Sequence, residues 1–224
     1  MADAPQRTAS PVCFLHELEP DAAGGFAAVD PEQRRDVARW RRAERERLIA
    51  ARLALDPATR AALTARLAGH LDALLGSLHG VVVSAWLPFR GEPDLRPWMA
   101  AAAARGAVTA LPVVEARGRP LRFCTWRPGE ALAPGPWGIP MPAGGEAVVP
   151  DLMLAPVVGF DGEGFRLGYG GGFFDRTLAA LAPRPRAVGV GLAAARLATI
   201  FPQPHDVPMD MIVTEAGCAV RRSP

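Results

Sequence analysis

The sequence predicts an α/β fold, in which helices pack against a mainly parallel β-sheet. Residues 81–87, 107–114 and 151–158 are short apolar runs rich in Val, Leu and Ala, as expected for buried strands. Residues 57–75 carry leucines at three- and four-residue spacing, which is typical of a helix packed on a core. The last of the apolar runs leads into a glycine-rich segment and then a helix-forming segment. This alternation of strands and helices favours parallel strand pairing.

The composition is that of a water-soluble protein with a substantial core. The chain has 224 residues, half of them hydrophobic, which suits one α/β domain or two small ones. We expect an irregular N-terminal arm over residues 1–29 and a single domain over residues 30–224. The net charge of +2 provides no field for nucleic acid or an anionic membrane. Three cysteines without a Cys-x-x-Cys motif, no visible secretory signal and no apolar run of membrane-spanning length predict a cytoplasmic location.

A long helix rich in arginine follows the predicted arm. Asp30 and Pro31 form a helix start, with Asp as the N-cap and Pro at the first position. The helix is predicted to run to about residue 55, and Arg41, Arg45 and Arg52 lie along one edge of its apolar stripe. Such a row of arginines could reach into a cleft or form a solvated basic face.

The loop after the first predicted strand holds a candidate substrate-binding residue. In open α/β sheets, ligands bind at the C-terminal ends of the strands, where residues 88–94 are expected. Glu92 is therefore a candidate substrate acceptor, whereas Asp94 is equally well explained as the N-cap of a helix over residues 95–104.

The proline-rich connection over residues 128–150 follows another predicted strand, residues 121–126, and is too long for a simple turn. Trp126, Trp137 and Ile139 could form the wall of a pocket for a flat aromatic ligand, or the tryptophans could cap the sheet edge.

Further strands are predicted at residues 187–192, 211–215 and 218–220. In the loop that precedes the last two, Asp206 and Asp210 could face a metal ion or a basic partner.

The segment over residues 159–176 carries the clearest functional pattern. A strand, a glycine-rich loop and a helix present backbone N–H groups to an anion, and the glycines at 168 and 170–172 remove the Cβ atoms that would keep a phosphate away. Arg166 could add a cationic fork and Asp175 an oxygen ligand for Mg2+. No Gly-Lys-Ser/Thr follows, so this is not a Walker loop. Glycine alone would also fit a mobile surface loop.

Taken together, these segments resemble the 5-formyltetrahydrofolate cyclo-ligase family, also called methenyltetrahydrofolate synthetases, over about residues 34–215. The segments that carry the resemblance, in chain order, are the arginine helix (Arg41, Arg45, Arg52), Trp86–Glu92, Trp137–Pro140, Pro150–Leu152, Val158–Asp161, Arg166–Gly172 with Asp175 and Arg176, His205–Asp210 and Ile212–Glu215.

The resemblance implies a three-layer α/β/α sandwich with a mainly parallel central sheet, similar to the sugar-phosphate isomerase and CoA-transferase-like group. It also implies a reaction, the ATP-dependent conversion of 5-formyltetrahydrofolate to 5,10-methenyltetrahydrofolate with release of ADP and phosphate. ATP would phosphorylate the formyl oxygen, and the folate N10 nitrogen would then attack the activated carbon.

The resemblance further assigns roles to individual residues. Arg166 and Asp175 are the implied catalytic residues, and Asp175 with Asp206 would hold Mg2+. The implied ATP-binding residues are Arg41, Arg45, Arg166, Leu167, Gly168, Tyr169, Gly170, Gly171, Gly172, Phe173 and Phe174. The implied folate-binding residues are Leu87, Glu92 and Trp137. Mg2+ and ATP are thus the expected cofactor and co-substrate; we expect a monomer and neither a membrane nor a nucleic-acid partner.

Three positions depart from the common pattern of this family. Arg41 stands where many members have lysine, Phe173 and Phe174 stand where two tyrosines are commoner, and Met141 replaces a usual Glu or Gln. These departures leave open a paralogue that acts on a related substrate. An isomerase or CoA-transferase-like enzyme that uses Glu92 is a second possibility, and a non-catalytic nucleotide- or RNA-binding module is a third.

Overall fold

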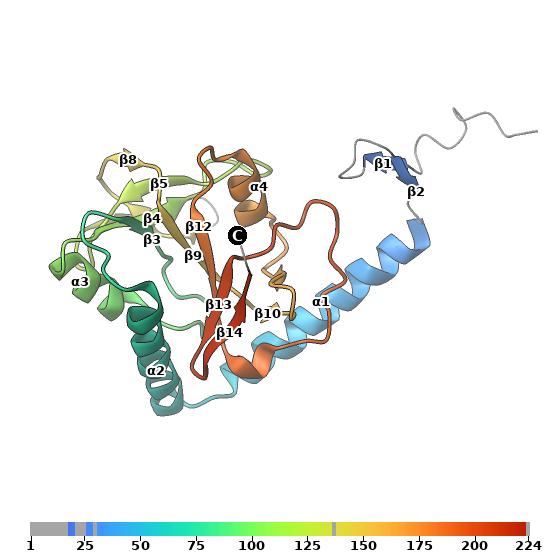
Figure 1. Ribbon diagram of the computed structural model, residues 1–224, viewed down its shortest axis with the longest axis horizontal. Coiled ribbons are helices and arrows are strands. Elements are labelled where there is room, and N and C mark those ends of the chain that lie inside the picture. The colour runs from blue at the N-terminus through green and yellow to red at the C-terminus, as the bar shows by residue number, and fades with distance from the viewer. Residues whose placement is uncertain (1–17, 21–25, 29–30, 136–137, 223–224) are drawn as a thin grey trace, which may run out of the picture. The chain divides into compact units, whose positions relative to one another are not determined.

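The computed structural model describes residues 18–20, 26–28, 31–135 and 138–222 (Figure 1). The chain divides into two compact units, Met1–Ala43 and Glu44–Pro224, and the division falls within helix α1 (Pro31–Leu53). In the first unit, strand β1 (Leu18–Pro20) pairs antiparallel with β2 (Phe26–Ala28). The predicted arm over residues 1–29 therefore includes a short strand pair among its described residues. The predicted N-cap, Asp30, lies outside them.

The second unit is built on one large sheet that has eight strands among the described residues. They are β3 (Val82–Ser84), β4 (Val108–Val113), β5 (Arg122–Thr125), β8 (Ala147–Val148), β9 (Leu152–Pro156), β12 (Arg186–Val190), β13 (Met211–Thr214) and β14 (Gly217–Arg221). Their spatial order is β14-β13-β12-β9-β3-β4-β5-β8. The five strands from β13 to β4 pair in parallel, while β14, β5 and β8 pair antiparallel at the two edges. The predicted mainly parallel sheet is confirmed.

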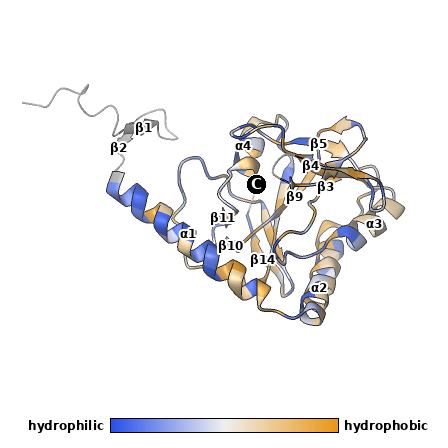
Figure 2. Ribbon diagram, turned by 180° about the vertical axis from the view of Figure 1, so that it is seen from behind, coloured by the Kyte–Doolittle hydropathy of each residue, from blue (hydrophilic) through white to orange (hydrophobic). Residues whose placement is uncertain are grey.

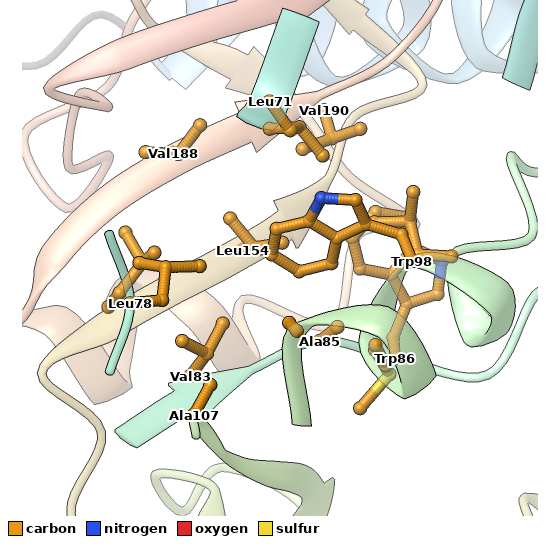
Figure 3. Close-up of a cluster of buried hydrophobic side chains, with 14 of the residues drawn as sticks. Leu71, Leu78, Val83, Ala85, Trp86, Trp98, Ala107, Leu154, Val188 and Val190 are labelled. Atoms are coloured by element: carbon orange, nitrogen blue, oxygen red, sulfur yellow. The ribbon is translucent and has the colours of Figure 1, made fainter. Parts of the chain in front are cut away.

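Helices cover both faces of this sheet. Successive strand residues point to opposite sides, so each strand contributes apolar side chains to a core on each face. In β9, Leu152 and Leu154 belong to the core that includes residues of α2 (Pro57–Leu75) and α3 (Arg96–Ala104). Figure 3 shows Leu154 among the side chains of that core. Met153 and Ala155 face the opposite core, which is completed by residues 48 and 49 of α1 and by α4 (Phe173–Ala180). The three-layer α/β/α architecture expected from the sequence is confirmed.

Local sequence signals set the ends of the helices on the first face. The Asp56 carboxylate accepts a hydrogen bond from the Thr59 amide at 2.9 Å, and α2 stops at Gly76, whose φ of +69° suits glycine. Helix α3 begins one residue later than predicted, with Leu95 at the N-cap position. Asp94 nevertheless accepts a hydrogen bond from the Arg96 amide at 3.1 Å.

Two long connections, which show no regular pattern in the sequence, each contain a short β-hairpin. In the proline-rich connection, β6 (Leu132–Ala133) pairs antiparallel with β7 (Met141–Pro142). Between β9 and α4, β10 (Gly159–Phe160) pairs antiparallel with β11 (Arg166–Leu167). The glycine-rich loop therefore follows a hairpin strand rather than a strand of the main sheet. A short 3-10 helix, η3 (Ala193–Ala195), follows β12.

The hydropathy of the helices matches these positions. Figure 2 shows α1 as largely hydrophilic, whereas apolar residues concentrate in the strands and along parts of α2 and α3. Among the residues that the structure describes, none of the helices is both long enough and apolar enough to span a lipid bilayer.

Candidate active site

The glycine-rich loop, residues 168–172, connects β11 to the N-terminus of α4. Gly170 has a φ of +90° and Gly172 a φ of +62°, a region in which residues with a Cβ are strained. Gly172 is the N-cap of α4, so the loop ends where the first backbone N–H groups of a helix point outward. This geometry is suited to binding an anion.

Two arginines of α1 contact this loop from the same side of the helix. The Arg45 Nε donates a hydrogen bond to the Gly168 carbonyl oxygen at 2.6 Å, and the Arg52 Nη2 donates one to the Tyr169 hydroxyl at 2.8 Å. Seven residues, about two helical turns, separate the two arginines, so their side chains leave α1 in nearly the same direction. The structure thus brings Arg45 to the predicted ATP loop. Arg41 belongs to the first unit, and its role stays a prediction.

Phe173 and Phe174, the two departures from the expected tyrosines, each lie beside an arginine. The Arg176 guanidinium carbon is 5.5 Å from the centre of the Phe173 ring, and Arg176 also donates a hydrogen bond to the Gly171 carbonyl oxygen. The Arg166 guanidinium carbon is 5.7 Å from the centre of the Phe174 ring. Both phenyl rings therefore support cations at the loop, a contact that needs no hydroxyl group.

Arg166, the predicted cationic fork, lies in the protein interior. Its side chain is only 4% exposed; its Nη2 lies 3.1 Å from Asp175 Oδ1, and its Nη1 donates to the Val207 carbonyl oxygen at 3.0 Å. The Val207 amide in turn donates to the same Asp175 oxygen at 3.1 Å. Burial lowers the pKa of Arg166, while the charges of Asp175 and Asp206 oppose that shift. Arg166 therefore links β11, α4 and the loop over residues 203–209.

Asp175 and Asp206 supply carboxylates beside this arginine. The Asp206 side chain is 9% exposed, and its Oδ2 accepts a hydrogen bond from the Gln203 amide at 2.6 Å. In the described part of the chain, no group of three or more His, Cys, Asp or Glu side chains forms a metal-binding cluster. Two carboxylates nevertheless fit Mg2+, which commonly takes one or two protein carboxylates and completes its shell with water and substrate phosphates. The bonds of Asp175 to Arg166 and Val207 both use Oδ1, so the donor set is compatible with such an ion.

Glu92 points into the protein from the loop after β3. Its Oε2 accepts a hydrogen bond from the Phe89 amide at 2.9 Å. Its Oε1 and the Trp86 Nε1 are buried, and neither atom has a hydrogen-bond partner among the described residues. Burial raises the pKa of Glu92, and the Phe89 amide only partly offsets this effect. Glu92 is thus a buried carboxyl group with one oxygen left for another polar group.

Leu87 and Trp126 line a cavity of about 470 Å³ on the α3 side of the sheet. The wall also includes Pro97 and Leu132, and the charged pair Asp94 and Arg96 contributes to the lining. The structure therefore brings predicted folate-binding Leu87 and the predicted wall residue Trp126 together. Trp137, the other predicted folate-binding residue, lies outside the described residues.

Two connections of the site were not predicted. Arg52 links α1 to both Tyr169 and the Arg90 carbonyl oxygen, although the sequence showed only its place in the arginine row. Its seven-residue spacing from Arg45 is the signal that could have suggested a shared loop. Asp161, 2% exposed, accepts hydrogen bonds from the amides of Glu163, Phe165 and Ile200, and so fixes the turn between β10 and β11.

Comparison with known proteins gives a consistent result. A sequence model described as the 5-formyltetrahydrofolate cyclo-ligase family matches residues 37–215. A 5-formyltetrahydrofolate cyclo-ligase of Mycolicibacterium smegmatis is 34% identical over 163 residues, which is 65% of this chain and 82% of that protein.

Two solved structures have a similar fold. The NMR structure of Aquifex aeolicus 5,10-methenyltetrahydrofolate synthetase has a TM-score of 0.69 and 28% identity, and the match covers 81% of this chain and 92% of that one. A 5,10-methenyltetrahydrofolate synthetase from Mycoplasma pneumoniae has a TM-score of 0.64 at 19% identity, over 78% of this chain and 98% of that one, and supports the fold alone. The family match covers well over half of the sequence, and the chain belongs to the 5-formyltetrahydrofolate cyclo-ligase family.

Proposed function

We propose that the protein converts 5-formyltetrahydrofolate to 5,10-methenyltetrahydrofolate, with hydrolysis of ATP to ADP and phosphate. The main support for the proposal is that three segments within the family match contact one another in the structure. Arg45 on α1, the glycine-rich loop and the buried pair Arg166–Asp175 are linked by hydrogen bonds and an ion pair, although they are far apart in the sequence. This arrangement combines a glycine-rich loop contacted by arginines with nearby carboxylates, which suits phosphoryl transfer from ATP.

The ATP phosphates would bind at residues 167–174 and Arg45, while the ATP-binding role of Arg41 stays a prediction. The helix N-terminus at Gly172 favours negative charge, and Arg45 and Arg176 both approach the loop. Arg166 would keep Asp175 oriented and would offset part of the carboxylate charge near the phosphates. This offset is useful because two unpaired carboxylates would repel ATP.

Mg2+ would be held by Asp175 and Asp206. When bound, it would neutralise phosphate charge and orient the terminal phosphoryl group. The two side chains come from different segments, α4 and the loop over residues 203–209, which Arg166 connects through Asp175 and Val207. Displacement of either segment would therefore alter the proposed donor set.

The folate would bind near Leu87, Glu92 and Trp137. Glu92 has one buried oxygen without a hydrogen-bond partner among the described residues, and a nitrogen-rich ring could supply the missing donor. Burial favours the uncharged form of its carboxyl group, which can also donate a hydrogen bond. This pairing would favour a polar heterocycle over an apolar ring of the same shape.

In the proposed reaction, the formyl oxygen attacks the terminal phosphorus of ATP, so that an O–P bond forms and the bond to ADP breaks. The folate N10 nitrogen then attacks the activated formyl carbon and loses its proton, and phosphate leaves with the former formyl oxygen and takes up that proton. The protein mainly positions the two substrates and balances charge. Arg45 and Arg176 would face the developing negative charge, while Arg166 holds the Asp175 carboxylate in place.

Purified protein mixed with 5-formyltetrahydrofolate, ATP and Mg2+ tests the proposal directly. The ultraviolet absorbance of the methenyl product should rise only when all three are present, with one ADP formed per product. ATP binding without any product would refute the assigned reaction and favour a paralogue with another substrate.

We also propose a cytoplasmic location. Cys124 and Cys218 form no disulfide among the described residues, and free cysteines are typical of a reducing compartment. Expression with a fluorescent tag and cell fractionation would test it.

A further inference from the structure

Arg52 joins the two loops that are proposed to bind the two substrates. It is 7% exposed, although it lies on a helix with many solvent-facing arginines. Its Nη2 donates to the Tyr169 hydroxyl in the glycine-rich loop at 2.8 Å. Its Nε donates to the Arg90 carbonyl oxygen, in the loop that carries Glu92, at 3.1 Å. One buried guanidinium group thus bonds to both loops.

Tyr169 completes the connection on the other side. Its hydroxyl donates a hydrogen bond to the Phe89 carbonyl oxygen at 3.3 Å, and its ring lies 5.7 Å from the Phe89 ring at a tilt of 58°. The Phe89 amide donates to Glu92 Oε2 at 2.9 Å. A continuous chain of hydrogen bonds therefore runs from Arg52 through Tyr169 and Phe89 to Glu92.

The loop that carries Glu92 combines an exposed side chain with an unusual backbone conformation. Phe89 is 60% exposed, Arg90 is a non-glycine residue with a φ of +48°, and Gly91 follows with a φ of +77°. A Cβ at Gly91 would lie 3.4 to 3.6 Å from side-chain and backbone atoms of residues 52 and 53, so the loop packs closely against α1. The left-handed conformation of Arg90 is costly for a residue with a Cβ unless neighbouring contacts hold it, whereas glycine adopts it readily. The Arg52 bond to the Arg90 carbonyl is such a contact.

We propose that Arg52 is a positioning residue that acts through Tyr169 and the Arg90 carbonyl, so that the ATP loop and the folate loop are ordered together. The inference rests on the proposed function and adds a regulatory property to it. When one substrate orders its own loop, the shared arginine and tyrosine order the other loop as well. The second substrate then binds to a prepared site, which gives positive coupling between ATP and folate binding.

Three variants distinguish this positioning role from the effect of simply removing a positive charge from α1. Arg52→Gln removes the cation and keeps a polar side chain, and Tyr169→Phe removes one hydroxyl but keeps the ring. Arg47→Gln is the matched control, because Arg47 lies on the same helix, is 59% exposed and pairs with Glu44 within one turn. Tyr169 is 40% exposed, so its variant is expected to fold even if Arg52→Gln does not.

The first measurement needs no activity. Tyr169 is the only tyrosine in the chain, so protein made with carbon-13 tyrosine gives a single set of tyrosine ring signals. Arg52→Gln should shift that signal and Arg47→Gln should leave it unchanged. An unshifted signal in folded Arg52→Gln would overturn the contact itself, whatever reaction the protein catalyses.

The second measurement is calorimetric titration of a non-hydrolysable ATP analogue with Mg2+, and of 5-formyltetrahydrofolate, each alone and in the presence of the other. In the wild type and in Arg47→Gln, each ligand should tighten the other. In Arg52→Gln and Tyr169→Phe this mutual effect should fall about tenfold or more, the scale expected for loss of a hydrogen bond to a charged group. Unchanged coupling in both variants, with the tyrosine signal shifted, would overturn the positioning role.

Failure of the proposed function would look different. If the protein binds no folate, the tyrosine signal still tests the contact, and the ATP analogue titration still tests whether Arg52 orders the glycine-rich loop. An ATP analogue affinity that is equal in wild type and Arg52→Gln would then overturn the inference on its own.

Discussion

Arg166 and Asp175 form a largely buried ion pair, with Nη2 3.1 Å from Oδ1 and side-chain exposures of 4% and 19%. The pair joins a hairpin strand to the first turn of α4, and the Val207 main chain bonds to both partners. Removal of one charge from such a pair leaves the other buried without full compensation. Asp175 is therefore expected to contribute both to the stability of the fold and to the proposed metal site.

Asp175→Asn should reduce turnover by about a hundredfold or more, because it removes a proposed Mg2+ ligand. It should also lower the free energy of unfolding by about 2 kcal/mol, less than for a fully isolated pair because Asp206 still faces Arg166. Product absorbance and urea unfolding measure the two effects. Asp36→Asn, which alters an exposed pair with Arg39, should change neither. Wild-type activity in Asp175→Asn would remove this residue from the mechanism.

Glu92→Gln should make the protein more stable at neutral pH. Burial raises the pKa of Glu92 in the folded state, so the carboxyl group favours folding when protonated and loses that contribution as pH rises through the raised pKa. The gain in melting temperature from Glu92→Gln should therefore be present at pH 7 and should shrink below the ordinary pKa of glutamate. A gain that grows towards acid pH would contradict the assignment.

The same substitution should affect the single tyrosine. The pKa of Tyr169 is raised to about 12, chiefly by burial and then by the charge of Glu92, while Arg52 acts in the opposite direction. Glu92→Gln should lower the pKa of Tyr169 towards its usual value near 10. The tyrosinate absorbance measures this in an alkaline titration, with circular dichroism to confirm that the protein is still folded. An unchanged tyrosine pKa would argue against contact between the two loops.

Alanine substitutions at Gly168 and Gly170 distinguish the effect of backbone strain on stability from the effect of a Cβ on phosphate binding. Gly170 has a φ of +90°, and a Cβ there would lie 3.6 Å from the Arg45 guanidinium, so Gly170→Ala should lower stability by about 1–2 kcal/mol. A Cβ at Gly168 meets nothing within 4 Å. Gly168→Ala should thus leave stability unchanged, and any loss of ATP affinity would report that a phosphate approaches this backbone. If both variants bind ATP like the wild type, the loop is not the phosphate site.

Leu71→Ala tests the packing on the other side of the sheet. Leu71 is fully buried in the core of Figure 3, so its truncation should cost about 2–5 kcal/mol of unfolding free energy. Val149→Ala is the control, because Val149 is 57% exposed and its truncation should cost about 0.5 kcal/mol or less. Similar losses in both variants would contradict this description of the core.

The parts of the fold predicted correctly are those with local signals. Helix α2 begins at an Asp-Pro pair and ends at a glycine, and both capping signals are set by residues adjacent in the sequence. The buried strands are continuous apolar runs, because parallel strands are covered on both faces. The β10–β11 hairpin was missed, since strands of two residues carry no periodic pattern.

The site was predicted as a set of residues but not as a geometry. The sequence grouped Arg166 with the glycines as a possible cationic fork, and the structure buries it in β11 against Asp175. Arg52 and Tyr169 are 117 positions apart, and only the packing of α1 against the loop brings them together. The roles of all the predicted site residues stay predictions; for Arg41 and Trp137 the geometry adds nothing, because one belongs to the other unit and the other lies outside the described residues.

The central claim is that the site activates the formyl oxygen by transfer of a phosphoryl group from ATP. Substrate labelled with oxygen-18 in the formyl group, incubated with the protein, ATP and Mg2+, tests this claim when the released phosphate is analysed by mass spectrometry. We predict one labelled oxygen in each phosphate released, in equal amount to the methenyl product. Methenyl product accompanied by unlabelled phosphate would contradict the claim.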